Sequence, residues 1–92
     1  MTQIAFRMSQ YRYFRDNTEE RDMFYNDWSA NYRFEFFELP NRDYLLIAYN
    51  KSCSSLDEVL DDLNVMVGIL TDQFNVELMQ ITINSVSCKP LK

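Results

Sequence analysis

The sequence predicts a single α+β domain in which an antiparallel four-stranded sheet packs against two helices. Three observations predict this class. Apolar residues recur every three or four positions over 56–74, as they do on the buried side of a helix. Four other segments alternate apolar with polar residues or are nearly all apolar, as strands are. The chain has 92 residues, 47% of them hydrophobic, which suits one core and leaves no room for a second domain, so residues 1–92 form one unit.

The first predicted element is a strand over residues 4–13. Ile4, Phe6 and Met8 occupy alternate positions, and the two-residue rhythm resumes at Tyr11 and Tyr13. The slip at residues 9–10 indicates a β-bulge.

A short helix is predicted at 18–29. Residues 16–18 offer a polar N-cap, and Glu19 and Glu20 suit the positive end of the helix dipole. Phe24 and Trp28 lie one helical turn apart. If this segment is a loop instead, the expected fold is one long helix on a curved antiparallel sheet.

Two strands at 31–39 and 43–49 form a predicted hairpin. Tyr32, Phe34 and Phe36 alternate with charged residues in the first strand, and residues 40–43 have turn chemistry. The second strand is nearly continuous in apolar residues, which is typical of a central strand covered on both faces.

The helix at 55–74 is the clearest element. Ser55 followed by Glu58 is a capping box, and Asn75 is suited to the left-handed conformation that ends a helix. The segment 76–88 alternates as a last strand. The resulting order, β-α-β-β-α-β, is that of the ferredoxin-like fold.

The composition argues against catalysis and against direct binding to nucleic acid. Nine basic and fourteen acidic residues give a net charge of −5, so the chain is poorly suited to neutralise phosphates. The absence of histidine excludes Ser-His and Cys-His nucleophile pairs, and two cysteines cannot form a Cys₄ zinc site. Gly68 is the only glycine, so a Gly-rich phosphate loop is excluded. We therefore expect no enzyme activity, cofactor or metal.

The sequence also bears on location and on the state of its cysteines. The longest apolar run, 44–49, is far shorter than the ~20 residues that span a membrane. The N-terminal residues lack the features of a secretory signal, so we expect a cytoplasmic protein. In that compartment Cys53 and Cys88 are expected to be reduced thiols.

Charge is distributed unevenly along the chain. Between Ser52 and Ser87 there are six acidic residues and no basic one, and five of the six are expected to project outward from the helix, opposite its leucine stripe. This pattern suits a solvated helix face that keeps a domain in solution. It also suits a surface that imitates the phosphates of nucleic acid and occupies a basic groove on a DNA- or RNA-acting protein. The six residues are Asp57, Glu58, Asp61, Asp62, Asp72 and Glu77.

Aromatic residues are concentrated in the first part of the chain, where thirteen of the fourteen lie within the first 50 residues. Exposed aromatic side chains mark contact surfaces. The best candidates for partner contact are Tyr11, Tyr13, Tyr25 and Trp28. The alternatives are that these rings pack in the core or that a homodimer covers the second face of the sheet.

A short, acidic, aromatic-rich domain without catalytic groups resembles, in type, the small inhibitors that bacteriophages make against host defence. These include DNA-mimicking anti-restriction proteins and anti-CRISPR proteins. They share no common motif, so no residue role is carried over. The resemblance implies an inhibitor in the host bacterial cytoplasm that blocks the nucleic-acid site of a nuclease or effector complex. The alternatives are an assembly subunit that uses an aromatic sheet face and a small enzyme that uses carboxylates.

Overall fold

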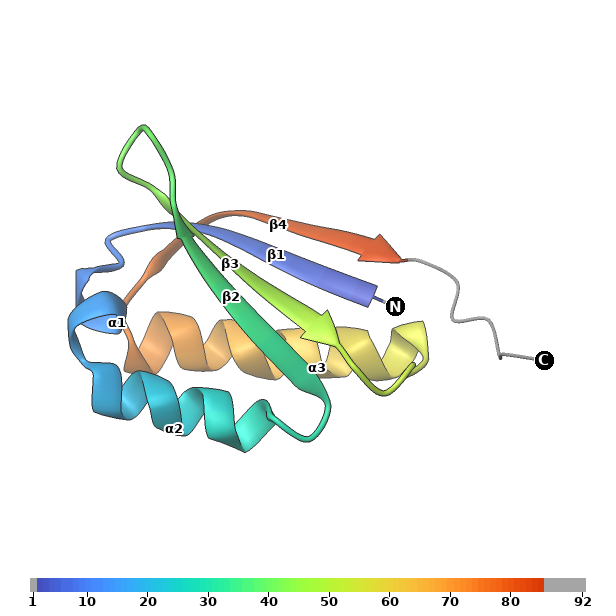
Figure 1. The fold of residues 1–92 in the computed structure, drawn as a ribbon. Helices are drawn as coiled ribbons and strands as arrows, with labels where there is room; N and C mark the ends of the chain where they lie inside the picture. Colours follow the sequence, from blue (N-terminus) through green and yellow to red (C-terminus); the bar gives the residue numbers. More distant parts are fainter. Residues whose placement is uncertain (1, 86–92) are drawn as a thin grey trace.

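The computed structural model describes residues 2–85 (Figure 1). The elements follow in the order β1 (Thr2–Ser9), α1 (Arg12–Asp16), α2 (Thr18–Trp28), β2 (Tyr32–Glu38), β3 (Tyr44–Asn50), α3 (Leu56–Gly68), the π-helical segment η1 (Ile69–Gln73) and β4 (Glu77–Ser85). The strands form one sheet in the order β2-β3-β1-β4, and every neighbouring pair is antiparallel. The predicted α+β class with a four-stranded antiparallel sheet is confirmed.

The core lies between the sheet and two of the helices. Figure 1 shows α2 and α3 below the same face of the sheet, whereas the described part of the chain places no helix on the opposite face. Alternate residues of the two central strands point to the covered face: Phe6 of β1 pairs with Leu46 of β3, and both are fully buried. The alternation predicted for β1 therefore reports which face meets the helices. β3, which the sequence predicts as nearly continuous in apolar residues, shows the same alternation of burial.

The segment after β1 differs from the prediction, because residues 12–16 form the helix α1 instead of extending the strand to residue 13. Gln10 adopts a φ of 49°, in the left-handed region, where β1 has ended. The N–H of Arg15 donates to the carbonyl of Tyr11 at 2.8 Å, which is a helical spacing. This turn buries Phe14 completely, and that burial outweighs the two-residue rhythm of Tyr11 and Tyr13.

Two further details of the prediction change with α1. The expected bulge at residues 9–10 is wrong, since the irregular register of β1 against β4 falls between Arg7 and Met8. The sheet also accompanies three α-helices instead of two. The short helix predicted at 18–29 is confirmed as α2.

The long helix begins as predicted. The Ser55 hydroxyl accepts from the Glu58 N–H at 3.3 Å, and the Glu58 carboxylate accepts from the Ser55 N–H at 3.4 Å, which completes the capping box. The helix changes to π geometry at η1, where the Phe74 N–H donates to the carbonyl of Ile69. Asn75 then takes a φ of 57°, so the predicted left-handed end is confirmed.

The loop between β3 and α3 is fixed by a buried side chain. Asn50, 1% exposed, accepts from the Ser54 N–H at 3.1 Å and donates to the Ser54 hydroxyl at 3.2 Å. Cys53 in this loop is disulfide-bonded, so the expectation of a reduced thiol at this position is wrong. That expectation rested on cellular compartment alone and used no geometry. Cys88 and the end of the strand predicted at 76–88 lie outside the described residues.

Within residues 2–85, none of the helices has the length and apolar character needed to cross a membrane.

Candidate functional site

The outward side of α3 and η1 carries four exposed carboxylates: Asp57, Glu58, Asp61 and Asp72. We call these four residues the acidic surface. At about 1.5 Å of rise per residue, the acidic surface extends for ~22 Å along the helix axis. Among residues 2–85, none of the four forms an ion pair with a lysine or arginine. Their negative charge is therefore available to a partner.

Two of the six predicted acidic residues are engaged with other elements, in addition to Glu58, whose carboxylate accepts hydrogen bonds from Ser55 in the helix cap. Asp62 is partly buried and accepts a hydrogen bond of 2.9 Å from the hydroxyl of Tyr32 on β2. It therefore connects α3 to the sheet and does not project outward with the acidic surface. Burial and this hydrogen bond raise the pKa of Tyr32 above its ordinary value. Glu77 lies at the start of β4 and accepts from the side-chain amide of Gln10 at 3.4 Å.

The aromatic candidates at the start of the chain lie on or beside α1. Tyr13 is 43% exposed, and its hydroxyl donates to Glu20 at 3.0 Å. That hydrogen bond and the negative charge of Glu20 raise the pKa of Tyr13. Tyr11 is half-buried and meets Tyr44 edge-on, with 3.9 Å between ring centroids. Both rings are thus accessible at one end of the molecule, Tyr13 more than Tyr11.

The other two aromatic candidates pack mainly against the sheet. Tyr25 of α2 stacks on Phe34 at 4.9 Å, and Trp28 meets Tyr32 edge-on at 5.9 Å. Burial raises the pKa of Tyr25 to about 12. Within the described chain, the indole N–H of Trp28 is buried without a hydrogen-bond partner. Tyr25 and Trp28 therefore cover β2 and contribute less to any outer contact surface than the sequence suggests.

The helix-free face of the sheet presents a second set of apolar residues. The register places Ile47 between Ala5 and Glu35, and Leu45 beside Phe37, which is 43% exposed. The strand predicted to be covered on both faces is central but carries helices on one face only.

Charged residues frame this helix-free face. Arg33 lies over the ring of Tyr49 at 4.3 Å and pairs with Glu35 at 3.2 Å. Arg7 and Asp43 form an ion pair of 3.0 Å. In the sequence, Phe37 indicates that this face carries apolar side chains. The other aromatic residues of its strand occupy alternate positions, so Phe37 lies on the opposite face from them.

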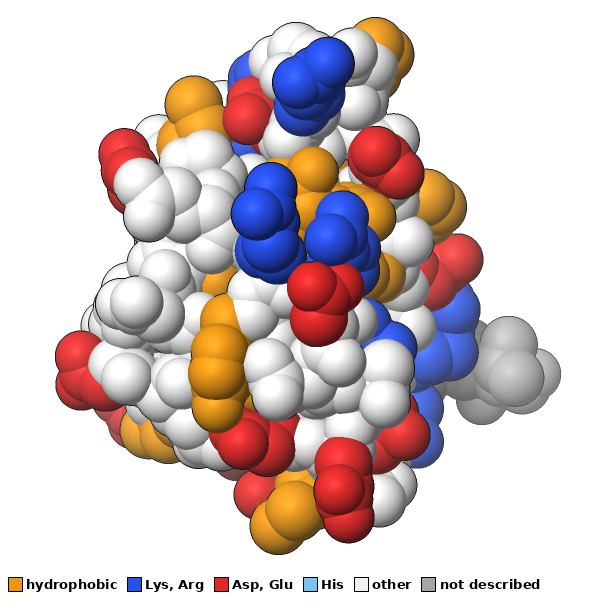
Figure 2. All heavy atoms as spheres, turned by 90° about the vertical axis from the view of Figure 1, so that its left-hand side faces the viewer, with side chains coloured by type: hydrophobic (Ala, Val, Ile, Leu, Met, Phe, Trp, Pro, Cys, Tyr) orange, Lys and Arg blue, Asp and Glu red, His pale blue; other side chains and the backbone are white. Residues whose placement is uncertain are grey.

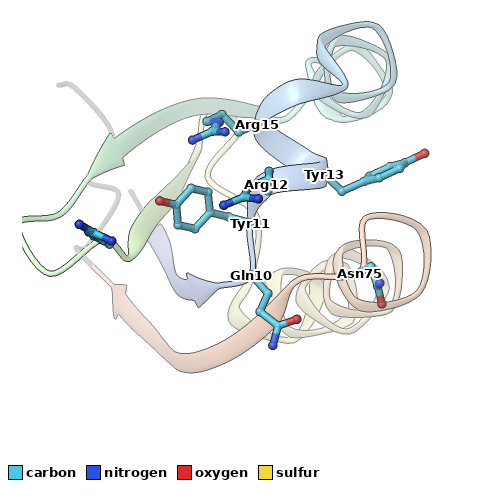
Figure 3. A pocket seen from close by; sticks show the side chains of 7 residues that line it. Gln10, Tyr11, Arg12, Tyr13, Arg15 and Asn75 are labelled. Carbon is cyan, nitrogen blue, oxygen red and sulfur yellow. The ribbon is translucent and has the colours of Figure 1, made fainter.

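A pocket of about 490 Å³ opens at the end of the molecule that contains α1. Figure 2 looks toward this end and shows basic side chains gathered there. Three of the nine basic residues of the chain line the pocket; two belong to α1 and one to the turn between β2 and β3. We call it the arginine pocket; its lining is Gln10, Tyr11, Arg12, Tyr13, Arg15, Arg42 and Asn75 (Figure 3). The sequence offers no motif for it, because Arg42 and Asn75 are distant in the chain from the other lining residues, which lie within 10–15, and because the net charge is negative.

No protein-family model, no curated protein and no solved structure matches this chain. Inference about function therefore depends on the geometry and charge of these surfaces.

Among residues 2–85, no three histidine, cysteine, aspartate or glutamate side chains group closely enough to hold a metal ion. The described chain offers three surfaces of different chemistry, which are the acidic surface, the helix-free sheet face and the arginine pocket.

Proposed function

We propose that the protein is a non-enzymatic binding protein whose acidic surface occupies a basic site on a partner protein. The observation that supports this proposal is the set of four exposed carboxylates, which no cation of the described chain neutralises. A basic partner surface relieves the mutual repulsion of these carboxylates and is attracted over a distance of about one Debye length. Such association is fast and weakens as salt is added.

The partner that suits this chemistry is a protein that binds nucleic acid. Its basic site is arranged for a row of phosphates, and the acidic surface offers negative groups along α3 and η1. Asp57 and Asp61 lie one helical turn apart, and Asp72 lies eleven residues farther on. A nuclease or a restriction or CRISPR effector in the bacterial cytoplasm is the class implied by the resemblance to phage inhibitors.

We also assign the fold to the ferredoxin-like type. The assignment is supported by the strand order, because β3 lies between β1 and β2, and β1 lies between β3 and β4. Each strand–helix–strand unit is therefore split by a strand of the other, as in a split βαβ arrangement. On this assignment, α1 and η1 are additions to the basic order.

The proposal is tested by a pull-down of the tagged protein from bacterial lysate, repeated with excess duplex DNA. Asp57→Lys, Asp61→Lys and Asp72→Lys together reverse the acidic surface and spare the helix cap. We expect the triple variant to lose at least about tenfold in affinity for the captured partner, and to lose the salt dependence of binding. Duplex DNA is expected to displace the wild-type protein from that partner.

A matched control carries the same change of charge on α2, as Glu19→Lys, Asp22→Lys and Asp27→Lys, all at exposed positions. This variant is expected to bind the partner nearly as the wild type does. Equal loss in both triple variants would mean that net charge, and not the acidic surface, governs binding. A partner that DNA cannot displace would count against a nucleic-acid site.

The second candidate function is an assembly subunit that pairs through the helix-free sheet face. It is favoured by the exposed ring of Phe37 beside Leu45 on that face. Sedimentation equilibrium at high protein concentration tests it, with Phe37→Glu as the disrupting variant. A concentration-dependent dimer that Phe37→Glu abolishes would support this candidate, and a strict monomer would exclude self-assembly.

A further inference from the structure

The arginine pocket gathers cationic side chains from two separate parts of the chain. Arg12 and Arg15 belong to α1, whereas Arg42 belongs to the turn between β2 and β3. The turn holds Arg42 with a φ of 68°, and its N–H donates to the carbonyl of Leu39 at 3.1 Å. The tertiary fold therefore places Arg42 and α1 around one hollow, which the sequence alone does not indicate.

Among the described residues, two of the three arginines form no ion pair, although Arg12 is close enough to Asp16 for its charge to contribute, after the hydrogen bond from Arg15, to lowering the pKa of that carboxyl. Arg15 pairs with Asp16 at 2.8 Å, but within residues 2–85 neither Arg12 nor Arg42 has a carboxylate within ion-pair distance. Of the residues that the structure describes, no aspartate or glutamate lines the pocket. Clustered like charges repel one another, and an anion placed among them converts that repulsion into attraction. This arrangement is notable in a chain whose net charge is −5.

The other groups of the pocket indicate what kind of anion fits. Figure 3 shows Arg12 and Arg15 on the side of α1 close to the ring of Tyr11, with Gln10 farther along the same chain segment and Asn75 on the opposite side. Guanidinium groups recognise phosphate oxygens through paired hydrogen bonds. The Tyr11 ring offers an apolar surface for the rest of a ligand, as aromatic side chains do for nucleobases.

We propose that the arginine pocket binds a small organic phosphate, with Arg12 and Arg42 contacting the phosphate and Tyr11 contacting the organic part. The volume of about 490 Å³ lies in the range of sites for small molecules. This site lies at the η1 end of the long helix, where Asp72 of the acidic surface also lies, and away from Asp57 and Glu58 at the start of α3. The lining of the pocket includes none of the four residues of the acidic surface, so the inference does not rest on the proposed partner.

The test is a titration of the ¹⁵N-labelled protein followed by two-dimensional NMR. The probes are adenosine monophosphate, inorganic phosphate and adenosine. Adenosine monophosphate is expected to shift the amide signals of residues 10–15, 42 and 75 with saturation below about 10 mM. Inorganic phosphate is expected to shift the same signals with about tenfold lower affinity, and adenosine is expected to leave them unchanged.

Arg12→Gln and Arg42→Gln are each expected to weaken binding of adenosine monophosphate about tenfold. Both side chains are exposed, so the spectra should show the wild-type fold. Arg33→Gln on the helix-free face is the matched control and is expected to leave the affinity unchanged.

Four results would overturn the proposal. The first is the absence of saturating shifts with adenosine monophosphate, and the second is that Arg33→Gln weakens binding of adenosine monophosphate as much as the other two variants do. The third and fourth are that adenosine, or inorganic phosphate, binds as tightly as the monophosphate. None of these results bears on the pull-down with the acidic-surface variants, so the two proposals fail separately.

Discussion

Phe14 provides the most direct test of how the N-terminal segment folds. The sequence rhythm predicts a strand in which Tyr11 and Tyr13 continue the alternation of the preceding residues and Phe14 lies on the other face, whereas the structure buries Phe14 on α1 and leaves Tyr13 43% exposed. The two arrangements predict opposite rankings for two alanine variants, Phe14→Ala and Tyr13→Ala. The comparison is well matched because both residues are aromatic and adjacent in the chain.

The expected cost of each variant follows from its contacts. Phe14 is fully buried, and its ring lies 4.8 Å from that of Phe74 and 5.2 Å from that of Phe36. Removing a buried phenylalanine side chain costs about 3–5 kcal/mol, since apolar burial is lost and a cavity remains. Tyr13→Ala removes one exposed hydrogen bond to Glu20 and is expected to cost less than about 1 kcal/mol.

These values are large relative to the stability of a small domain. At about 0.05–0.15 kcal/mol per residue, a chain of 92 residues is expected to have a free energy of unfolding of roughly 5–14 kcal/mol. Phe14→Ala should therefore lower the Tm by about 12 °C or more, while Tyr13→Ala should lower it by less than about 8 °C.

The assay is urea unfolding followed by far-ultraviolet circular dichroism, with thermal scans for the Tm. If Phe14→Ala does not fold, Phe14→Leu keeps part of the packing and is expected to cost about half as much. A larger loss of stability in Tyr13→Ala than in the Phe14 variants would refute the assignment of Phe14 to the core.

Three further predictions concern individual contacts. Ser55→Ala removes the hydroxyl that accepts from the Glu58 N–H and should reduce the free energy of unfolding in urea by about 1 kcal/mol, whereas an unchanged midpoint would mean that the cap is dispensable. Burial raises the pKa of Tyr25 from its ordinary 10.0 to about 12, so the neutral ring stabilises the fold below pH 10 and this contribution is lost as the pH rises to about 12. Tyr25→Phe should flatten that part of the stability profile in alkaline denaturation, and an unaltered profile would contradict the raised pKa. Tyr32→Phe removes the hydrogen bond to Asp62 and should cost about 1–2 kcal/mol, and a double-mutant cycle with Asp62→Asn should show coupling between the two side chains.

The sequence predicted α3 and the hairpin well because their signals are local. A capping box and an apolar stripe are defined by residues three or four apart, so Ser55, Glu58 and the leucines report on the helix directly. The alternation of Tyr32 and Phe34 reports on a strand for the same reason.

The prediction failed where the deciding contact is distant in the chain. Phe14 is buried by Phe36 and Phe74, which are 22 and 60 residues away, so no local pattern reveals α1. Asp62 had the expected helical position, but the hydroxyl of Tyr32 across the core engages its carboxylate. The disulfide at Cys53 is likewise a property of geometry, and composition does not report on it.

By itself, the sequence determined the α+β class, the capped long helix and the presence of exposed acidic residues along that helix. These follow from periodicity, local capping and the solvation cost that keeps charges outside. Only the tertiary structure decided that, within residues 2–85, one face of the sheet lacks helices and that Arg42 joins Arg12 and Arg15 around one pocket. The physical reason is that burial and charge clustering depend on which segments pack together, and that packing is set by contacts between residues far apart in the chain.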